Sequence, residues 1–279
     1  MRDFFGKKVY IVGGSSGIGL STANMLSAEG AHIIIFARTK DVLERALKEI
    51  TDHRVSDTQQ FLCRQMDVSI REEVGAVMSG AVSEFGVPEV LINCAGRAYP
   101  HRFEDITYEQ FDETMKINLY GTWNTVSALV PYMKNKGGYI VNVSSIAGFI
   151  GVFGYTDYSA SKFGVIGFSE ALRSELKKYG ITVSVLCPPD TDTPGFHVEN
   201  RTKPEETKAV SGNVKVMQPD KVARALIKGM REGKFIVIPG FDGKLTCMAK
   251  RFFPSLVEYV MDRDIRKVHK HRKLEIMNM

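Results

Sequence analysis

The chain has 279 residues, of which 44% are hydrophobic and 25% charged, a composition typical of a globular protein. Its formal charge of +5 is confined to residues 263–273, where six basic residues and one acidic residue leave the remainder formally neutral. A neutral body lacks the basic face of a nucleic-acid-binding domain, so we expect no nucleic-acid partner. The length and the lack of repeats or linkers in the sequence favour one domain.

The sequence also argues against membrane-spanning, secreted and metal-binding classes. No apolar run reaches the ~18 residues that a membrane-spanning helix needs. The first residues do not form the apolar core of a signal peptide. The cysteines are scattered without metal-ligand spacing, at positions Cys63, Cys94, Cys187 and Cys247. We therefore expect a cytoplasmic protein without a metal site.

Short apolar runs alternate with helical patterns along the chain. Strands are predicted at residues 9–12, 31–36, 61–63, 89–92, 138–143, 181–186 and 235–238. Helices are predicted at 17–29, 40–50, 70–85, 108–134 with a possible break, and 219–231, and a further helix contains Tyr158 and Lys162 and runs to about Tyr179. A loop-rich stretch is expected from Pro188 to about Gln218. The alternation predicts an α/β fold, a single doubly wound parallel sheet of about seven strands with helices on both faces, Rossmann-like.

The first predicted strand runs directly into a glycine-rich turn. Glycines permit a tight turn and a close approach of the backbone to a diphosphate, and the next helix begins with free N–H groups. A plain turn between strand and helix is the alternative. The position after the first strand favours a nucleotide cofactor held by Gly13, Ser15, Ser16, Gly17, Ile18 and Gly19.

The second predicted strand ends at a basic residue, at a position where dinucleotide-binding folds usually have an acidic one. A cofactor without a 2′-phosphate usually meets an acidic residue there, which binds the ribose hydroxyls. Arg38 occupies this place and can pair with a 2′-phosphate, assisted by Lys40 and Ser15. The alternative is a surface arginine at the end of the strand. The pattern favours NADPH/NADP+ over NADH.

Further polar and small residues follow the third and fourth predicted strands. Asp67, followed by Val68, either accepts a hydrogen bond from the adenine amino group or caps the next helix. Asn93, Ala95 and Gly96 follow the fourth strand, where small residues permit close packing against the cofactor ribose. We expect cofactor contacts from all five.

A tyrosine and a lysine stand four residues apart, at Tyr158 and Lys162, with Ser145 thirteen residues before the tyrosine. On a helix these two positions share one face. A lysine ammonium there can favour ionisation of a phenol, whose ordinary pKa is about 10. Asn118, a weak helix former within a predicted helix, marks either a local distortion with a polar purpose or an interior hydrogen bond.

In combination, these motifs resemble the short-chain dehydrogenase/reductase family over about residues 6–240. The resemblance implies a catalytic set of Asn118, Ser145, Tyr158 and Lys162. In it, Tyr158 donates a proton, Ser145 polarises a carbonyl group, Lys162 lowers the tyrosine pKa and holds the nicotinamide ribose, and Asn118 positions a water that relays protons to Lys162. It also implies cofactor contacts from Tyr158, Pro188, Thr191 and Thr193.

Three residues depart from the family pattern. Val12 replaces a threonine, Cys94 replaces the second asparagine of the motif after the fourth strand, and Pro189 replaces a glycine after the sixth strand. The last change stiffens the backbone at the start of the stretch that forms the substrate lid in the family. Residues 187–204 and the apolar segment 149–154 resemble a narrower branch, which reduces the ketone of a long-chain sphingoid base with NADPH.

The implied activity is hydride transfer from NADPH to the ketone of a lipid-like substrate. Asp190 and Asp192 either face a substrate ammonium or cap the turn, and capping is favoured. One alternative activity is reduction of another ketone, such as a 3-oxoacyl thioester or a steroid-like compound. A second alternative is an idle NADPH-binding sensor, against which the intact Ser, Tyr and Lys argue.

We expect residues 1–244 to form the NADP-dependent reductase domain, with a lid at 188–218, and 245–279 to form an amphipathic and basic C-terminal extension. The extension is either a solvated tail or a peripheral contact with an anionic membrane surface. The family resemblance further implies a homo-oligomer, a dimer or tetramer. The interface is expected on the helix that carries Tyr158 and on its neighbour. Four apolar residues belong either to that interface or to the core: Phe163, Ile166, Phe168 and Leu172.

Overall fold

The computed structural model describes residues 3–212 and 215–277, with side chains described up to His271. The described chain forms one seven-stranded sheet in the order β3-β2-β1-β4-β5-β6-β7, with every pair parallel. The strands are β1 Lys8–Val12, β2 His32–Ala37, β3 Phe61–Gln65, β4 Val90–Asn93, β5 Gly138–Val143, β6 Ile181–Leu186 and β7 Ile236–Val237. The predicted fold class is therefore confirmed, and each predicted strand overlaps the strand that the structure contains.

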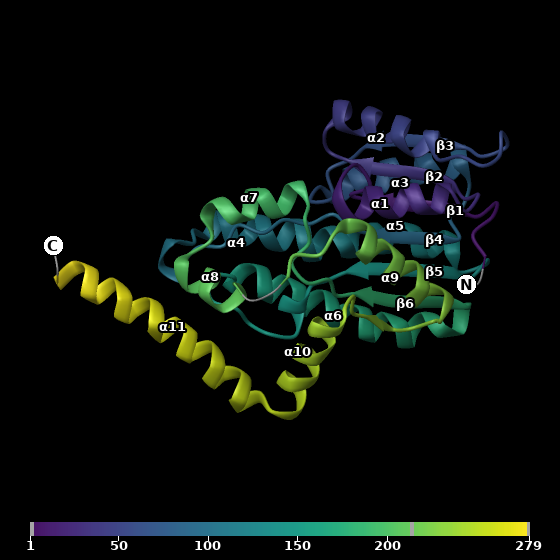
Figure 1. The fold of residues 1–279 in the computed structure, drawn as a ribbon. Helices are drawn as coiled ribbons and strands as arrows, with labels where there is room; N and C mark the ends of the chain where they lie inside the picture. The colour runs from purple at the N-terminus through teal and green to yellow at the C-terminus, as the bar shows by residue number, and fades with distance from the viewer. Residues whose placement is uncertain (1–2, 213–214, 278–279) are drawn as a thin grey trace.

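Helices cover both faces of the sheet (Figure 1). The helices of the body are α1 Gly17–Ser27, α2 Lys40–Asp52, α3 Arg71–Phe85, α4 Tyr108–Met115, α5 Gly121–Met133, α6 Thr156–Leu176 and α9 Pro219–Arg231. Short 3₁₀ turns lie at η1 Phe103–Asp105, η3 Ile146–Gly148 and η4 Lys177–Tyr179. One apolar core lies under α1, α2 and α9, and a second lies under α3, α5 and the end of α6.

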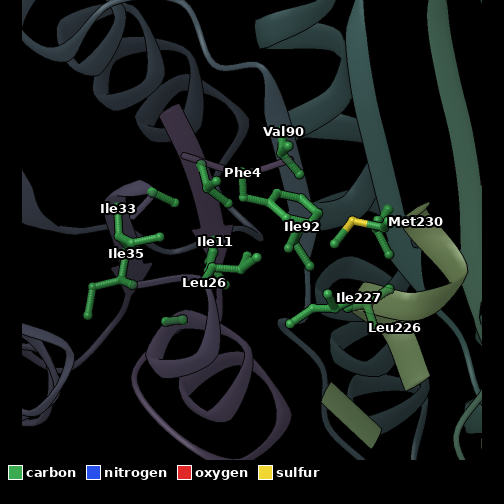
Figure 2. Packing of buried hydrophobic residues seen from close by; sticks show 14 of the residues in the cluster. Phe4, Ile11, Leu26, Ile33, Ile35, Val90, Ile92, Leu226, Ile227 and Met230 are labelled. Atoms are coloured by element: carbon green, nitrogen blue, oxygen red, sulfur yellow. The ribbon is translucent and has the colours of Figure 1, made fainter. Parts of the chain in front are cut away.

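The strand side chains alternate between the two cores. Val9 and Ile11 of β1 belong to the core beneath α1, whereas Tyr10 and Val12 belong to the opposite one. Figure 2 shows the first core, in which Ile11 lies among side chains from neighbouring strands and from α9. This two-residue period follows from the pleat of a strand, and burial on both faces explains the nearly continuous apolar runs of the sequence.

All the candidate motifs follow the carboxyl ends of strands. The chain turns back at this edge after β1, β2, β3, β4, β5 and β6, so residues distant in sequence converge there. The strand order reverses between β1 and β4, which is where open parallel sheets bind their ligands. The fold therefore places the candidate site at the carboxyl edge beside β1 and β4.

The predicted loop from Pro188 to about Gln218 is largely wrong. The structure has two helices there, α7 Pro194–Thr202 and α8 Glu205–Ser211, and residues 213 and 214 of the predicted lid lie outside the described residues. Local signals explain α7, because the Thr193 hydroxyl accepts a hydrogen bond from Phe196 N and Pro194 fits the first helical position. Figure 1 shows α7 and α8 beyond one end of the strands, near α4.

The helix predicted at 108–134 breaks as expected. Between α4 and α5 the chain forms one π-helical turn, η2 Lys116–Tyr120, which contains Asn118. Such turns insert an extra residue into a helix and are frequent at functional sites. The break therefore coincides with a candidate site residue.

The C-terminal extension is helical in the described residues. Helix α10 spans Phe241–Phe252, so it crosses the expected boundary at 245, and α11 spans Pro254–Met277, with the break at Pro254 as expected. Figure 1 shows α11 running outward from the body, past α8. His269 Nε2 of α11 lies 3.2 Å from Glu206 Oε1 of α8. The side chains of Arg272 and Lys273, part of the predicted basic run, lie outside the described residues. No helix among the described residues has the length and apolar character needed to span a membrane.

Candidate active site

The glycine-rich turn is packed too tightly for side chains. A Cβ on Gly13, whose φ is +77°, would lie 2.6 Å from Ala95 N in the loop after β4. A Cβ on Gly19 would lie 2.2 Å from Gly13 O, within the turn itself. At Gly17, with φ of +53°, it would lie 2.8 Å from Thr193 Cγ2 of the lid. The glycines thus bring three segments together at one point of the sheet edge.

The start of α1 fits a bound diphosphate. Ser16 is the N-cap residue in extended conformation, and its side chain makes no capping hydrogen bond to the helix. The first-turn N–H groups and the positive end of the helix dipole are therefore available to an anion. With the glycine cradle, this arrangement fits the nucleotide part of a dinucleotide, bordered by Ser15 and Ile18.

Arg38 stands at the end of β2, as predicted. Its backbone carbonyl accepts a hydrogen bond from Gln65 Nε2, 2.8 Å away, while its side chain is exposed. Within the described residues the Arg38 guanidinium has no hydrogen bond or ion pair. Lys40 begins α2 and lies 3.9 Å from Glu44 at the surface. Two basic side chains, Arg38 and Lys40, thus lie at the carboxyl end of β2.

Asp67 is not the cap of α3. The N-cap residue is Ile70, and the Asp67 carboxylate instead accepts hydrogen bonds from the backbone N–H (2.9 Å) and hydroxyl (2.7 Å) of Ser69. The capping alternative is therefore wrong, because Asp67 lies three residues before the N-cap and its carboxylate bonds to Ser69 instead. The contact of Asp67 and Val68 with an adenine stays a prediction.

Asn93 serves the scaffold through its side chain. Its Nδ2 donates to Asn142 Oδ1, 2.9 Å away, and its Oδ1 accepts from the hydroxyl of Thr125, 2.8 Å away. Asn142 in turn donates to Ser169 of α6, so a buried chain of hydrogen bonds joins α5, β4, β5 and α6. Any cofactor contact from Asn93 therefore falls to its backbone.

Asn118 organises the loop after β4. Its Oδ1 accepts from Arg97 N (2.8 Å), and its Nδ2 donates to Arg97 O (3.0 Å) and to Ser161 Oγ (3.0 Å). Both of the predicted alternatives for Asn118 therefore hold, a helix distortion and an interior hydrogen bond. The side-chain amide therefore holds the backbone of Arg97 and positions the loop, and the water that Asn118 is expected to position stays a prediction. A Cβ on Gly96 would lie 3.3 Å from both Asn118 Oδ1 and Lys162 Nζ.

Ser145, Tyr158 and Lys162 come together between β5 and the first turns of α6. Ser145 caps η3 by accepting a hydrogen bond from Ala147 N, 3.1 Å away. The Ser145 hydroxyl also lies near the Tyr158 phenol and acts to lower the pKa of that phenol. Lys162 Nζ lies 5.6 Å from the centre of the Tyr158 ring and donates to Val143 O, 3.0 Å away. The helical spacing thus puts both side chains beside the serine.

Burial controls the protonation of this group. It raises the pKa of Tyr158, Glu199 raises that pKa further, and Ser145 opposes them. Burial lowers the pKa of Lys162 to about 8. The net pKa of Tyr158 is therefore raised in this structure, because desolvation outweighs the opposing effects, and a lowering contribution from Lys162 stays a prediction. A tyrosine that stays protonated is suited to donate a proton to a carbonyl oxygen.

The start of the lid is fixed against the same edge. Pro188 O accepts from Ile146 N (3.1 Å), next to Ser145. The Thr191 hydroxyl donates to Pro189 O (2.8 Å), and Thr191 pairs with Met217 in an isolated parallel bridge that closes the base of the lid. Thr193 thus lies against Gly17 of the glycine turn and Pro188 lies next to the segment of Ser145, whereas Thr191 is held by Pro189 and Met217.

The sequence reasoning missed a cluster beside Tyr158. The Tyr155 hydroxyl donates to Glu199 of α7, and the rings of Tyr155 and Tyr158 lie 5.5 Å apart between centroids. Lys203, with its side chain 4% exposed, lies 3.2 Å from Glu199 and 3.6 Å from Asp190. The available signal was spacing, since the Tyr pair is three apart and the Glu–Lys pair four apart, both of which share a helix face.

The fold and the site define an oxidoreductase with a dinucleotide turn at the first strand and a Ser–Tyr–Lys group at the sheet edge. Comparison with known proteins agrees, because the family model described as short chain dehydrogenase matches residues 7–204. The chain belongs to this family. It is an oxidoreductase that acts on CH–OH or C=O groups with a nicotinamide cofactor. Among the described residues no group of His, Cys, Asp and Glu side chains is arranged to hold a metal ion.

Named relatives are similar over most of their length. The 3-ketodihydrosphingosine reductase of Bos taurus is 42% identical over 248 residues, which are 87% of this chain and 75% of that protein. The 3-dehydrosphinganine reductase TSC10A of Arabidopsis thaliana is 35% identical over 278 residues, 94% of this chain and 82% of that protein. A crystal structure of levodione reductase matches with a TM-score of 0.77 at 25% identity, covering 87% of this chain and 98% of the other.

Proposed function

We propose that this protein reduces 3-ketodihydrosphingosine to dihydrosphingosine with NADPH, a step in making sphingolipids. The observation that carries the proposal is the meeting of Ser145, Tyr158 and Lys162 at the edge of a sheet whose first turn accommodates a dinucleotide. The relatives named for this reduction support the choice of substrate.

Each side chain has a distinct part in the proposed reaction. When bound, the nicotinamide cofactor supplies the hydride. Tyr158 donates its proton to the carbonyl oxygen, and Ser145 hydrogen-bonds the same oxygen and stabilises its developing negative charge. Lys162, held by the Val143 carbonyl, presents its ammonium to the cofactor ribose and to the proton path behind Tyr158. Asn118 holds the backbone of Arg97 through two hydrogen bonds and so positions the loop after β4 beside Lys162.

The preference for NADPH rests on Arg38. Its exposed guanidinium is unpaired among the described residues and follows β2, where the adenosine ribose of a dinucleotide binds in such folds. A guanidinium can bind a 2′-phosphate through two hydrogen bonds, which NADH does not offer.

An apolar segment beside the lid supports a long alkyl chain as ligand. Residues 149–154 lie between Ser145 and α6, and the carbonyl of Phe153 accepts a hydrogen bond from Thr207 of α8, 2.7 Å away. Phe149, Val152 and Phe153 are only partly buried, so they retain apolar surface for a hydrocarbon.

Peripheral membrane contact is part of the proposal. Helices α10 and α11 and the residue between them expose large apolar side chains, which are Phe241, Leu245, Met248, Phe252, Phe253, Leu256 and Tyr259. Basic residues such as Lys250 and Arg251 accompany them. Such a surface suits the interface of a membrane with anionic lipids, from which a lipid substrate can be drawn.

We also propose a homo-oligomer formed through α5 and α6. Trp123 and Phe163 are 42% and 45% exposed, and Phe168 and Leu172 line a groove together with Trp123. Exposed aromatic side chains around a groove are typical of protein interfaces. Ile166 instead faces Gly148 of η3, inside the subunit.

A substrate panel tests the proposed function. NADPH oxidation is followed with 3-ketodihydrosphingosine, a short 3-oxoacyl thioester and a steroid ketone, and each is repeated with NADH. We expect the highest kcat/KM for 3-ketodihydrosphingosine with NADPH. Faster turnover of the thioester or steroid would contradict the substrate, and tight NADPH binding without turnover of any ketone would point to a sensor.

A further inference from the structure

A negatively charged part of the lid reaches Tyr158, and the mechanism above does not use it. Tyr155 donates a hydrogen bond to Glu199 and its ring packs against that of Tyr158. Glu199 and Asp190 both raise the pKa of Tyr158 electrostatically. The two carboxylates therefore lie near the hydroxyl that we expect to donate the proton.

One lysine serves both carboxylates. Lys203 Nζ lies 3.2 Å from Glu199 Oε1 and 3.6 Å from Asp190 Oδ2, and the Glu199 side chain is only 15% exposed. Asp192 is paired elsewhere, 3.0 Å from His197. Largely buried carboxylates such as Glu199 are stable when paired with a counterion, and here one ammonium is shared between Glu199 and the partly exposed Asp190. The group therefore carries one excess negative charge and can accept one further cation.

We propose that Glu199 binds the substrate's ammonium group and so determines specificity for a ketone with an amine on the neighbouring carbon. This inference rests on the proposed function. In such a ketone one bond separates the amine-bearing carbon from the carbonyl carbon. A carboxylate that holds the amine beside Tyr158 therefore also brings the carbonyl oxygen to the Tyr158 hydroxyl. Lys203 remains as the counterion of Asp190.

The bound ammonium also eases proton transfer. The negative charges of Glu199 and Asp190 hold the proton on Tyr158, and a cation placed between them and the hydroxyl offsets this effect. Tyr158 then donates its proton more readily when the substrate is in place. The amine should therefore raise kcat as well as lower KM.

The test compares 3-ketodihydrosphingosine with the same ketone lacking its amine. In the full-length protein, Glu199→Gln should lower kcat/KM for the amino ketone by ~30–100-fold, the loss expected for a charged partner in a largely buried site. It should lower kcat/KM for the amine-free ketone by less than about 3-fold. Glu205→Gln, an exposed lid residue paired with Lys208, is the matched control and should change neither.

Equal losses for both ketones would overturn the proposal, because they would assign Glu199 to holding the lid in place. A wild-type protein that reduces the amine-free ketone but not the amino ketone would instead contradict the proposed function. Inhibition gives a second measurement. Octadecylamine should inhibit the wild type more strongly than octadecanol does. The Glu199→Gln substitution should weaken inhibition by octadecylamine and leave inhibition by octadecanol unchanged. If Glu199→Gln does not selectively reduce inhibition by the amine, the proposed role of Glu199 is overturned.

Discussion

The Lys162 ammonium donates a hydrogen bond to the carbonyl of Val143, the last residue of β5, at 3.0 Å. Ser145 follows two residues later, so the end of one strand positions both groups around Tyr158. Lys162 Nζ also lies 3.3 Å from the position of a Cβ on Gly96. A side chain at position 96 would therefore press on the ammonium, which would have to shift by a few tenths of an ångström to make room.

The stability of the folded protein should depend on pH through Lys162. Burial lowers its pKa from 10.5 to about 8. Below the folded pKa, folding buries a charge, and this cost is fully present. Between the folded and the unfolded pKa, the unfolded chain binds a proton that the folded chain does not, so stability rises with pH.

We therefore expect the wild type to gain stability relative to Lys162→Met as the pH rises, by up to about 1.4 kcal/mol per pH unit. Guanidinium unfolding of both proteins across this range measures the difference. Subtracting the variant removes the contributions of the other titrating groups. A difference that is flat, or that falls with pH, would contradict the burial of a charged Lys162.

Arg38→Gln should selectively weaken the use of NADPH as cofactor. Removing the guanidinium takes away charge-assisted hydrogen bonds to the 2′-phosphate, so kcat/KM for NADPH should fall ~10–100-fold while that for NADH stays nearly constant. Steady-state kinetics with both cofactors measure this. Arg45→Gln, on the exposed part of α2, is the control and should alter neither. An equal decrease in kcat/KM with both cofactors would show that Arg38 does not bind the 2′-phosphate.

Asn118→Ala should reduce both stability and turnover. The change leaves the N–H and C=O of Arg97 without their partner, at a cost of about 1–3 kcal/mol in the free energy of unfolding. Ser27→Ala is the matched control, because it removes a buried hydrogen bond to Ile50 O, between α1 and α2, that involves no candidate site residue. We expect similar destabilisation by both variants, with turnover lost only at Asn118. Normal turnover in Asn118→Ala would refute its positioning role.

Substituting exposed apolar residues of the C-terminal extension should release the protein from membranes. Changing Phe252, Phe253 and Leu256 to serine removes apolar area that is solvent-exposed in the fold, so unfolding should be unchanged. Co-sedimentation with vesicles containing anionic lipid should fall several-fold, while activity on a detergent-dispersed ketone persists. Unchanged sedimentation would argue that the C-terminal extension has another partner.

The fold could be predicted because its signals are local and redundant. Apolar runs such as Ile33–Ile35 are buried on both faces, and each is followed by a helical pattern. The lid was misjudged because its helices are short and polar. Thr193 caps α7 through its side chain, whereas Pro204 at the start of α8 makes no side-chain cap, and no apolar period in the sequence indicates either helix.

Within the site, residue types and spacing located the Ser–Tyr–Lys group, but not its electrostatics. The direction of the Tyr158 pKa depends on burial and on Glu199, which lies 41 residues further along the chain. The sequence also could not show that Asn93 is committed to Thr125 and Asn142, since that network forms only once α5 and β5 pack together. Long-range contacts of this kind have no local signature.

The central claim is that Tyr158 donates the proton to the substrate ketone. Tyr158→Phe keeps the ring and removes only the hydroxyl, so NADPH binding, followed by fluorescence titration, should change by less than about 3-fold. Turnover of 3-ketodihydrosphingosine should fall by at least ~10³-fold, consistent with the loss of a general acid. Turnover within about tenfold of the wild type, with NADPH still bound, would contradict the account.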